Sequence, residues 1–371
     1  MSDSVIKAFL ALLGLSFLVA IGWSAAGPAL EGRSDFVPFY VAAGLSGSSE
    51  LWEPERYFRF MQGRFGDYGA ALVWIRPPFY ALLLKPLSWF DFQTAHAAWW
   101  LCRLAALLGF VALWRVPSRG DAGLFLCLSL PALAGLMQGQ DVAFVLLLVA
   151  ASARLAGARR DRLAGLALSL CAIKFHLFLL LPALLVAQRK GRVLAGLALG
   201  AVAWIGLSFI AGGMSWPLHY SQVVFDGEVS PRSDSMPNLH GLLSDFPVAE
   251  WGVSAAIFLL SCAVFRRASL QDGLAICLLG GLLISRHSYV ADCLLLLPVS
   301  LVFVAGDRPA GLRFAAMLLL WPPIYLMLLS GGGLAQFAQV FLVLFWSFAS
   351  AHVCGVLPAR AMLSSSPNAT T

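Results

Sequence analysis

The stretch 5-VIKAFLALLGLSFLVAIGWSAAGP-28 decides the class of fold. It is long enough to cross the hydrocarbon core of a bilayer, which takes about 20 apolar residues in a helix. Its apolar part is too long for a typical secretory signal, and many apolar runs follow, so we interpret it as a retained first span. The whole chain is similar, with 60% hydrophobic and only 12% charged residues and a mean hydropathy of +0.82. A soluble domain carries about twice that charged fraction. We therefore predict a polytopic, all-α membrane protein.

The apolar segments indicate how many times the chain crosses the membrane. Thirteen are predicted: 5–28, 73–90, 93–114, 121–137, 141–156, 163–174, 176–188, 193–213, 251–265, 272–285, 289–305, 311–329 and 334–354. The basic clusters between them indicate the cytoplasmic side: Arg115 and Arg119; Arg154, Arg159, Arg160 and Arg162; Arg189, Lys190 and Arg192; Arg266 and Arg267; Arg308 and Arg313. All of these clusters lie on the same side of the membrane only if one of the two segments between 73 and 114 does not cross it. The best candidate is 73–90, which Pro77, Pro78 and Pro86 interrupt.

This topology predicts about 12 crossings, within a range of 11 to 13, and both termini in the cytoplasm. Residues 1–360 would form a single membrane domain, followed by a disordered cytoplasmic tail at 361–371. The acid-rich segments 29–72 and 214–250 would be outer loops. Two runs in the first loop have apolar side chains at helical spacing, which predicts amphipathic helices in the membrane interface: Phe36, Phe39, Tyr40 and Ala43; and Tyr57, Phe58, Met61 and Phe65.

Composition argues against several other functions. The net charge of +6 comes from the loop clusters and does not indicate nucleic-acid binding. All seven cysteines fall inside apolar runs and none has metal-ligand spacing, so they are expected to be small core residues. The chain also lacks an Asp-x-Asp motif, and we predict no metal. The excess of Arg over Lys, with abundant Ala, Gly and Leu, hints at a GC-rich bacterial genome.

Ionisable residues at membrane depth are expensive and by default functional. In the predicted topology several polar residues come at the outer ends of their spans, at the level of Asp35: Arg76, Gln140, Asp141, Lys174, His176, Arg286 and His287. An acid, imidazoles and several cations should therefore converge on one face of the protein. This convergence predicts a site.

Each of these residues also has a structural explanation. Asp35 could cap a helix that begins at Phe36, at about even odds with catalysis. His287 could be a satisfied histidine at a helix end, and Lys174 could extend its ammonium toward the membrane surface. Asp292 could orient a neighbouring helix or pair with a buried Arg. Arg103 and Lys85 are expected to be structural or surface-seeking, and Trp99-Trp100 to pack or to lie at the interface.

The order of motifs resembles glycosyltransferase family 87, the bacterial polyprenyl-phosphate-mannose-dependent mannosyltransferases of the GT-C fold. Five pieces carry the resemblance, in order: 34-SDFVPFYVAAGLSGSSELWEPERY-57, 74-WIRPPFYALLLKPL-87, 138-QGQDVAFVLLL-148, 159-RRDRLAGLALSLCAIKFHLFLLLP-182 and 282-LLISRHSYVADCLLLLP-298. The resemblance covers about residues 5–330. Two departures are visible, since the family usually has Ser-Pro-His at 285–287 and Lys-Pro at 174–175.

The resemblance implies an enzyme that transfers a sugar, expected to be mannose, from a polyprenyl-phosphate donor with inversion on the extracytoplasmic side of a bacterial inner membrane. No cofactor is expected beyond this lipid-linked donor; the partners are a glycolipid or glycan acceptor and the bilayer. Asp35 would be the general base and His287 would bind the acceptor or relay the proton. The expected phosphate ligands are Lys174, Arg286 and Arg76, and the expected sugar or acceptor ligands are Gln140, Asn238, Tyr40 and Tyr289.

Two alternatives stay open. A secondary transporter or lipid flippase could use Asp141, Lys174 and Asp292 as a proton or substrate relay. Transporters usually contain two halves with similar span patterns, which this sequence does not show. An inactive relative retained as a partner subunit is the other alternative, and the presence of Asp35 argues mildly against it.

Overall fold

The computed structural model describes residues 3–32, 34–66, 74–225, 233–305 and 308–356, and in these ranges its regular structure is entirely helical. The α-helices are α1 (Asp3–Leu30), α2 (Phe36–Leu45), α3 (Pro54–Phe65), α4 (Pro78–Leu84), α5 (Phe92–Leu113), α6 (Arg119–Cys127), α7 (Leu130–Met137), α8 (Val142–Gly157), α9 (Asp161–Ser169), α10 (Leu181–Ala187), α11 (Gly191–Gly212), α12 (Trp216–Phe225), α13 (Leu239–Leu243), α14 (Pro247–Phe265), α15 (Leu270–Ile284), α16 (Leu296–Val304), α17 (Ala310–Leu318), α18 (Pro322–Ser330) and α19 (Gly332–Val353). The 3₁₀ helices are η1 (Ser49–Trp52), η3 (Lys85–Trp89), η4 (Leu170–Phe178), η6 (Ser233–Ser235) and η7 (Val290–Leu295). The all-α prediction is confirmed. The predicted tail at 361–371 lies outside the described residues.

Several of these helices are long and apolar enough to cross a membrane. Within the described ranges, five meet this criterion by length and composition: 12–30 of α1, α5, α11, α14 and α19. Three bent pairs raise the number to eight if each is one span: α6 with α7, bent by 63°; α9–η4 with α10, bent by 111°; and α17 with α18, bent by 56°. The polytopic architecture is confirmed, whereas the twelve crossings stay a prediction.

The segment predicted not to cross is broken as expected. After Pro77, α4 lasts only seven residues, and Pro86 lies in the 3₁₀ helix that follows. Proline fixes φ and lacks an N–H donor, so it starts helices well and interrupts them elsewhere. At 1.5 Å per residue, α4 covers about 10 Å, a third of the hydrocarbon core.

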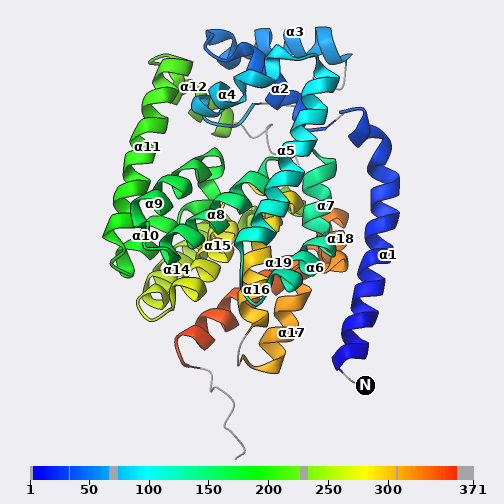
Figure 1. Cartoon of the computed structure of the whole chain (residues 1–371), viewed down its shortest axis with the longest axis vertical. Coiled ribbons are helices and arrows are strands. Elements are labelled where there is room, and N and C mark those ends of the chain that lie inside the picture. Colours follow the sequence, from blue (N-terminus) through cyan, green and yellow to red (C-terminus); the bar gives the residue numbers. More distant parts are fainter. Residues whose placement is uncertain (1–2, 33, 67–73, 226–232, 306–307, 357–371) are drawn as a thin grey trace, which may run out of the picture.

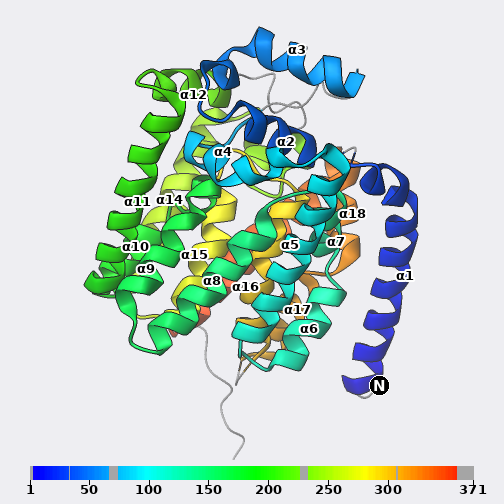
Figure 2. The same cartoon turned by 45° about the horizontal axis from the view of Figure 1, so that its top comes forward.

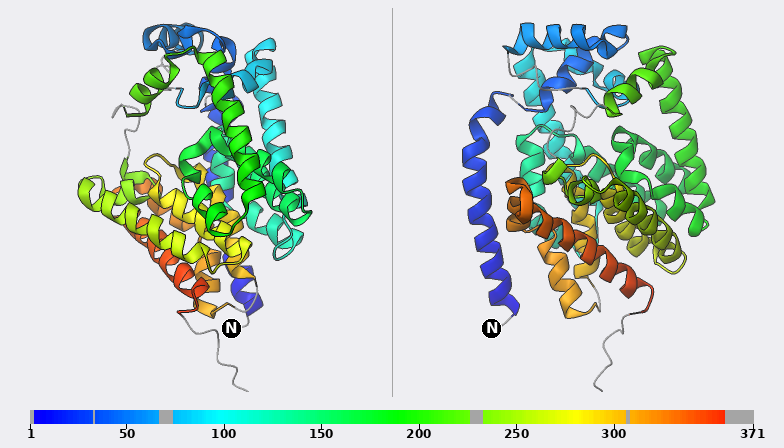
Figure 3. Two further views of the ribbon diagram at one scale, coloured as in Figure 1. Left: turned by 90° about the vertical axis from the view of Figure 1, so that its left-hand side faces the viewer. Right: turned by 180° about the vertical axis from the view of Figure 1, so that it is seen from behind.

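The two ends of the molecule differ in what they hold. In Figure 1, the start of α1 and the end of α19 lie at the lower end, while α2, α3, α4 and α12 gather at the upper end. Helices α5 and α11 run between these ends, and Figure 2 shows α3 lying across the top. The start of α1 and the end of α19 therefore lie at the same end of the described structure, and the sidedness of the termini stays a prediction. Figure 3 shows α1 at the edge of the bundle, where it packs on α7 and α18.

The first predicted outer loop contains one amphipathic helix rather than two. In α3, Tyr57 and Met61 are buried and Arg56 and Arg59 are exposed, as predicted. The amphipathic prediction for α2 is wrong, because all of its residues except Gly44 are buried. It packs on α4, α5 and η3.

Interrupted helices bring polar residues into the interior. The turn between α7 and α8, the kink in η4 and the start of η7 all pack against one another, and α15 packs on η4 and η7. Non-helical backbone at membrane depth is tolerated only where protein or a water-filled cavity covers it. These interruptions therefore mark where a polar site can lie.

Candidate active site

The site is built on the turn 138–141 between α7 and α8. Gly139 has a φ of +77°, which favours glycine. A Cβ at this position would lie 2.7 Å from Ser34 Oγ and 2.8 Å from the backbone nitrogen of Phe36. Only glycine therefore lets the start of α2 dock on this turn.

Two side chains of α5 hold the same turn. The indole N–H of Trp99 donates to the carbonyl of Gly139 (2.8 Å), and buried Arg103 donates to the carbonyls of Gly135 (2.9 Å) and Leu136 (2.8 Å). The last carbonyls of a helix lack intrahelical partners, so Arg103 satisfies the end of α7. The structural interpretation of Arg103 and Trp99 is confirmed, and the turn is fixed independently of any ligand.

Asp35 lies against this turn. Its backbone N–H donates to the carbonyl of Gln138 (2.8 Å), and its Oδ2 accepts a hydrogen bond from Gln140 Nε2 (2.5 Å). Although Asp35 is at the N-cap position of α2, its side chain makes no capping hydrogen bond. The capping alternative is therefore wrong for the carboxylate.

The environment of Asp35 suits a proton acceptor. Its side chain is half-buried, and Oδ1 accepts no hydrogen bond from the described residues. Burial raises the pKa of the Asp35 carboxyl above its ordinary value, while the Gln140 hydrogen bond and the charges of Lys174 and Arg76 offset part of that rise. One oxygen is thus held and the other is left for a ligand.

Lys174 lies at the kink of η4, where its φ of −132° and ψ of 48° interrupt the helix. Its ammonium pairs with Asp292 Oδ1 (2.6 Å) and Asp141 Oδ1 (3.2 Å), and the side chain is only 2% exposed. The expectation that Lys174 extends toward the membrane surface is wrong. The two carboxylates compensate its charge, as a buried cation requires.

Arg76, just before α4, completes the cluster. Its Nε lies 3.1 Å from Asp141 Oδ2, its Nη2 lies 3.4 Å from Asp141 Oδ1, and Nη2 also reaches Gln140 Oε1 at 3.5 Å. This two-point contact is the geometry that a guanidinium makes with a carboxylate. The structure brings Asp35, Gln140, Lys174 and Arg76 together, as the sequence predicted.

The loop that carries His287 is linked to this cluster by a backbone hydrogen bond. The N–H of Tyr289 donates to Asp292 Oδ2 (3.0 Å), so the loop that carries His287 is tied to the partner of Lys174. The His287 ring lies edge-on to Tyr289, with centroids 5.1 Å apart, and to His176, at 6.1 Å. Burial lowers the pKa of His287 to about 4, so its imidazole is neutral near pH 7.

Arg286 belongs to a neighbouring group of side chains. Its Nε lies 3.6 Å from Glu250 Oε1, and its guanidinium lies over the ring of Trp251, 5.6 Å from the centroid. The other oxygen of buried Glu250 lies 3.1 Å from His240 Nδ1. Because 49% of its side chain is exposed, Arg286 is the most accessible of the three predicted phosphate ligands.

Two predicted sugar ligands have structural roles. Asn238 caps α13, with its Oδ1 accepting from the N–H of Gly241 (2.8 Å), and its Nδ2 donates to the Ser285 carbonyl (2.8 Å) and Ser288 Oγ (2.9 Å). This pairing fixes the loop before His287. The Tyr40 hydroxyl donates to the carbonyl of Phe90 (2.8 Å) and accepts from Arg64 (3.1 Å). Among the described residues, neither side chain hydrogen-bonds to Asp35, Gln140, Lys174 or Arg76.

A comparison of the sequence with models of protein families shows to which family the chain belongs. The sequence model of glycosyltransferase family 87 matches residues 74–320, more than half of the chain. The chain belongs to glycosyltransferase family 87. No curated protein and no solved structure matches it significantly. The matched range includes every predicted site residue except Asp35 and Tyr40, which precede it.

Sequence reasoning missed some members of this family 87 site. Asp141 and Asp292 were recognised as ionisable residues at membrane depth, but their pairing with Lys174 was not predicted. Glu250 and His240 were not considered at all. Sequence position could have indicated the two aspartates as members of the site. Asp141 directly follows Gln140, and Asp292 lies five residues after His287.

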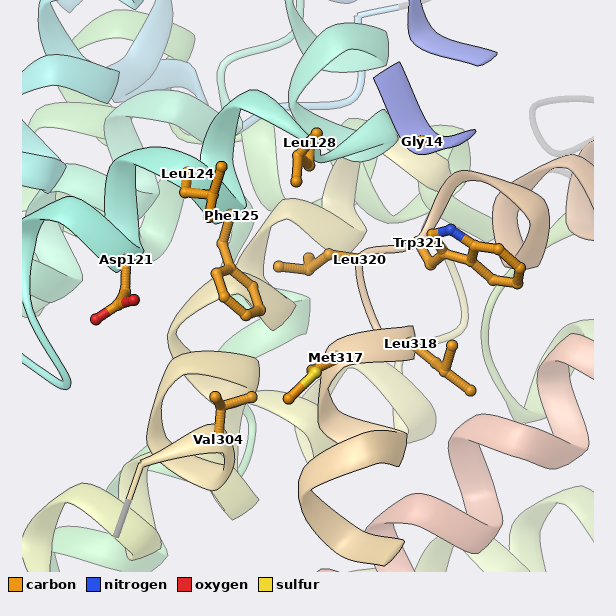
Figure 4. Close-up of a pocket in the computed structure, with 10 residues that line it drawn as sticks. All are labelled: Gly14, Asp121, Leu124, Phe125, Leu128, Val304, Met317, Leu318, Leu320 and Trp321. Atoms are coloured by element: carbon orange, nitrogen blue, oxygen red, sulfur yellow. The ribbon is translucent and has the colours of Figure 1, made fainter. Parts of the chain in front are cut away.

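Figure 4 shows a pocket elsewhere in this family 87 chain. It has a volume of about 170 Å³ and a largely apolar lining that includes Gly14 of α1, Phe125 of α6 and Trp321 before α18. None of the predicted site residues lines it. Among the described ranges, no group of three or more His, Cys, Asp and Glu side chains is placed to hold a metal ion.

Proposed function

We propose that this membrane glycosyltransferase transfers a sugar, mannose by resemblance, from a polyprenyl-phosphate donor to an acceptor on the extracytoplasmic side. The reaction is inverting and metal-independent, and a GT-C architecture would carry it. The observation that supports the proposal most is the Asp35 carboxylate, which is held through one oxygen by Gln140 and whose other oxygen is unengaged among the described residues. The family match supports the transferase activity itself.

Asp35 is the general base in this proposal. Its Oδ1 takes the proton of the acceptor hydroxyl while that oxygen forms a bond to the anomeric carbon. The bond between the anomeric carbon and the phosphate oxygen breaks, and its electron pair leaves with the polyprenyl phosphate. One displacement of this kind inverts the anomeric configuration. A carboxyl with a raised pKa is well matched to proton abstraction near neutral pH.

The leaving phosphate needs positive charge. Lys174, one of the three expected phosphate ligands, is buried between two carboxylates. Arg286 is half-exposed and becomes the first candidate for direct contact, while Lys174 and Arg76 contribute electrostatically from behind Gln140. A cation in a low-dielectric site stabilises the charge that builds on the leaving group. Neutral His287, with Tyr289 beside it, would hydrogen-bond the acceptor.

The transporter alternative uses residues that the structure pairs with one another. Asp141, Lys174 and Asp292 form a continuous chain of ion pairs, which also explains these residues as a buried structural network. The family match favours the transferase. Transport without sugar transfer by the purified protein would instead favour the relay.

The test is transfer by purified Asp35→Asn protein supplied with polyprenyl-phosphate mannose and a membrane lipid extract. Asparagine has the same shape but cannot accept the proton, so we expect kcat to fall by about 10²–10⁴. Donor binding should be retained, because the substitution removes no cation. Turnover near the wild-type rate would refute the role of Asp35. Other polyprenyl-phosphate sugars in the same assay test the choice of mannose.

A further inference from the structure

Gln140 lies between Asp35 and two cations. Its Nε2 donates to Asp35 Oδ2 (2.5 Å), while its Oε1 accepts from Lys174 Nζ (3.2 Å) and Arg76 Nη2 (3.5 Å). We propose that Gln140 is a positioning residue: its amide fixes the Asp35 carboxylate and keeps it from pairing directly with Lys174 or Arg76. The proposal rests on Asp35 being the base. It replaces our expectation that Gln140 binds sugar hydroxyls.

The amide side chain satisfies both neighbours at once. A carboxylate needs a donor and the two cations need an acceptor, and glutamine carries one of each on the same planar group. The network also fixes which way the amide points, since Nε2 faces the acid and Oε1 faces the cations. A glutamate here would confront Asp35 with a second negative charge, and a lysine would leave Lys174 without this acceptor.

Asp141 shows what direct pairing does to a carboxylate. It lies one residue further along the turn, and its oxygens contact Arg76 and Lys174 with the side chain wholly buried. Both of its oxygens are engaged, so it cannot accept a proton from a substrate. Asp35 avoids this state because the glutamine amide occupies the space that an ammonium would otherwise take.

The backbone sets the position of the amide before any side chain contributes. The N–H of Gln140 donates to the carbonyl of Gly135 (3.0 Å), and Trp99 holds the carbonyl of Gly139. The turn therefore presents Gln140 to Asp35 in one orientation. This preorganisation is expected for a residue that positions a catalytic group.

The effect of Gln140 on protonation has a definite sign. The charged groups facing Asp35 are Lys174 from η4 and Arg76 from before α4, which lower the carboxyl pKa, and Asp141 from before α8, which raises it. The Gln140 hydrogen bond also lowers it, against the larger effect of burial. Removing the amide donor should therefore raise the pKa further, so that Asp35 becomes protonated at a higher pH.

The experiment is an infrared titration of full-length protein in nanodiscs without substrate. The carboxyl band of Asp35 is the one that Asp35→Asn removes. Gln140→Leu, which cannot donate, should shift the midpoint of that band upward by about one pH unit. Gln140→Glu should shift it further, because two neighbouring carboxylates cannot both ionise easily. The donor KM of Gln140→Leu should stay within about twofold of wild type, since this variant adds no charge and removes no substrate contact.

Gln140→Glu keeps the shape of the side chain and an acceptor for Lys174 and Arg76, so it allows the test if the leucine variant fails to fold. Gln271→Leu, at an exposed glutamine at the start of α15, should titrate as wild type. An unchanged or lowered midpoint in the Gln140 variants would overturn the inference. So would a raised donor KM with an unchanged midpoint, which is the signature of a sugar ligand. An active Asp35→Asn enzyme would instead refute the proposed function.

Discussion

Lys174 is the residue on which the buried charges depend. Among the described residues, its ammonium is the only cation paired with Asp292, and it shares Asp141 with Arg76. An ion pair of this kind contributes little net stability, because desolvation offsets the Coulombic attraction. Removing one partner is costly, however, since the other charge stays buried without compensation.

Lys174→Met should destabilise the protein by about 3–5 kcal/mol, because methionine roughly keeps the length of the side chain but leaves the buried Asp292 carboxylate without a cation. Thermal unfolding in detergent measures this. Lys190→Met, at an exposed lysine after α10, is the matched control and should unfold as wild type. The double variant Lys174→Met with Asp292→Asn should recover part of the loss. A single variant as stable as wild type would contradict the assignment.

Helices α9 and α11 pack closely because small residues line their contact. A Cβ at Gly165 would overlap the carbonyl of Val193, and one at Gly196 would overlap the carbonyl of Arg162. Further along, a Cβ at Gly200 would overlap Ser169 Oγ. In membranes, small residues four apart let helix backbones approach, where packing rather than the hydrophobic effect drives association. Since α9 leads directly into η4, this contact also places Lys174.

We therefore expect Gly196→Leu to separate α9 from α11 and to destabilise the protein by about 1–3 kcal/mol or more. Sugar transfer should fall as well, because η4 moves with α9. Gly206→Leu makes the same change on the same helix, where nothing lies within 4 Å of a Cβ. The measurements are thermal unfolding and initial rates for both variants. Equal effects at the two positions would show that the contact does not matter.

Along its long axis, the molecule has one end formed by α2, α3, α4 and α12 and an opposite end that holds the start of α1 (Figure 1). Asp35 directly precedes α2, at the upper end, whereas the basic cluster Arg189, Lys190 and Arg192 lies at the start of α11, away from the end of that helix that is near α12 (Figure 1). The positive-inside rule places that basic end in the cytoplasm. A lipid-linked donor and an outer acceptor would then meet at the other end.

This orientation predicts different labelling of two cysteine variants in intact cells. Arg59→Cys, on the exposed side of α3, should react with a membrane-impermeant maleimide. Arg192→Cys, in the first turn of α11, should react only after the cells are opened. Wild-type protein gives the background of the native cysteines. Labelling of Arg192→Cys in intact cells would reverse the proposed orientation of the molecule.

The convergence of the site could be predicted because the ends of successive spans alternate between the two sides of a membrane. Residues far apart in the chain, such as Arg76, Gln140 and Lys174, therefore fall at one level once the topology is right. The same reasoning could not decide whether the Asp35 carboxylate caps a helix or belongs to the site. A carboxylate before Phe36 has the pattern of a helix cap, and only the position of Gln140 shows that it points elsewhere.

The sequence by itself determined that this protein is a bundle of membrane helices with polar residues at the ends and interruptions of its spans. Apolar length, proline positions and charge bias are local properties, and each acts within one segment. Only the tertiary structure decided which carboxylate meets which cation, that α2 is buried, and that Asn238 and Tyr40 are engaged structurally. Those outcomes depend on how α4, α7, η4 and η7 pack, and the low dielectric of their interior forces every charge there to find a partner.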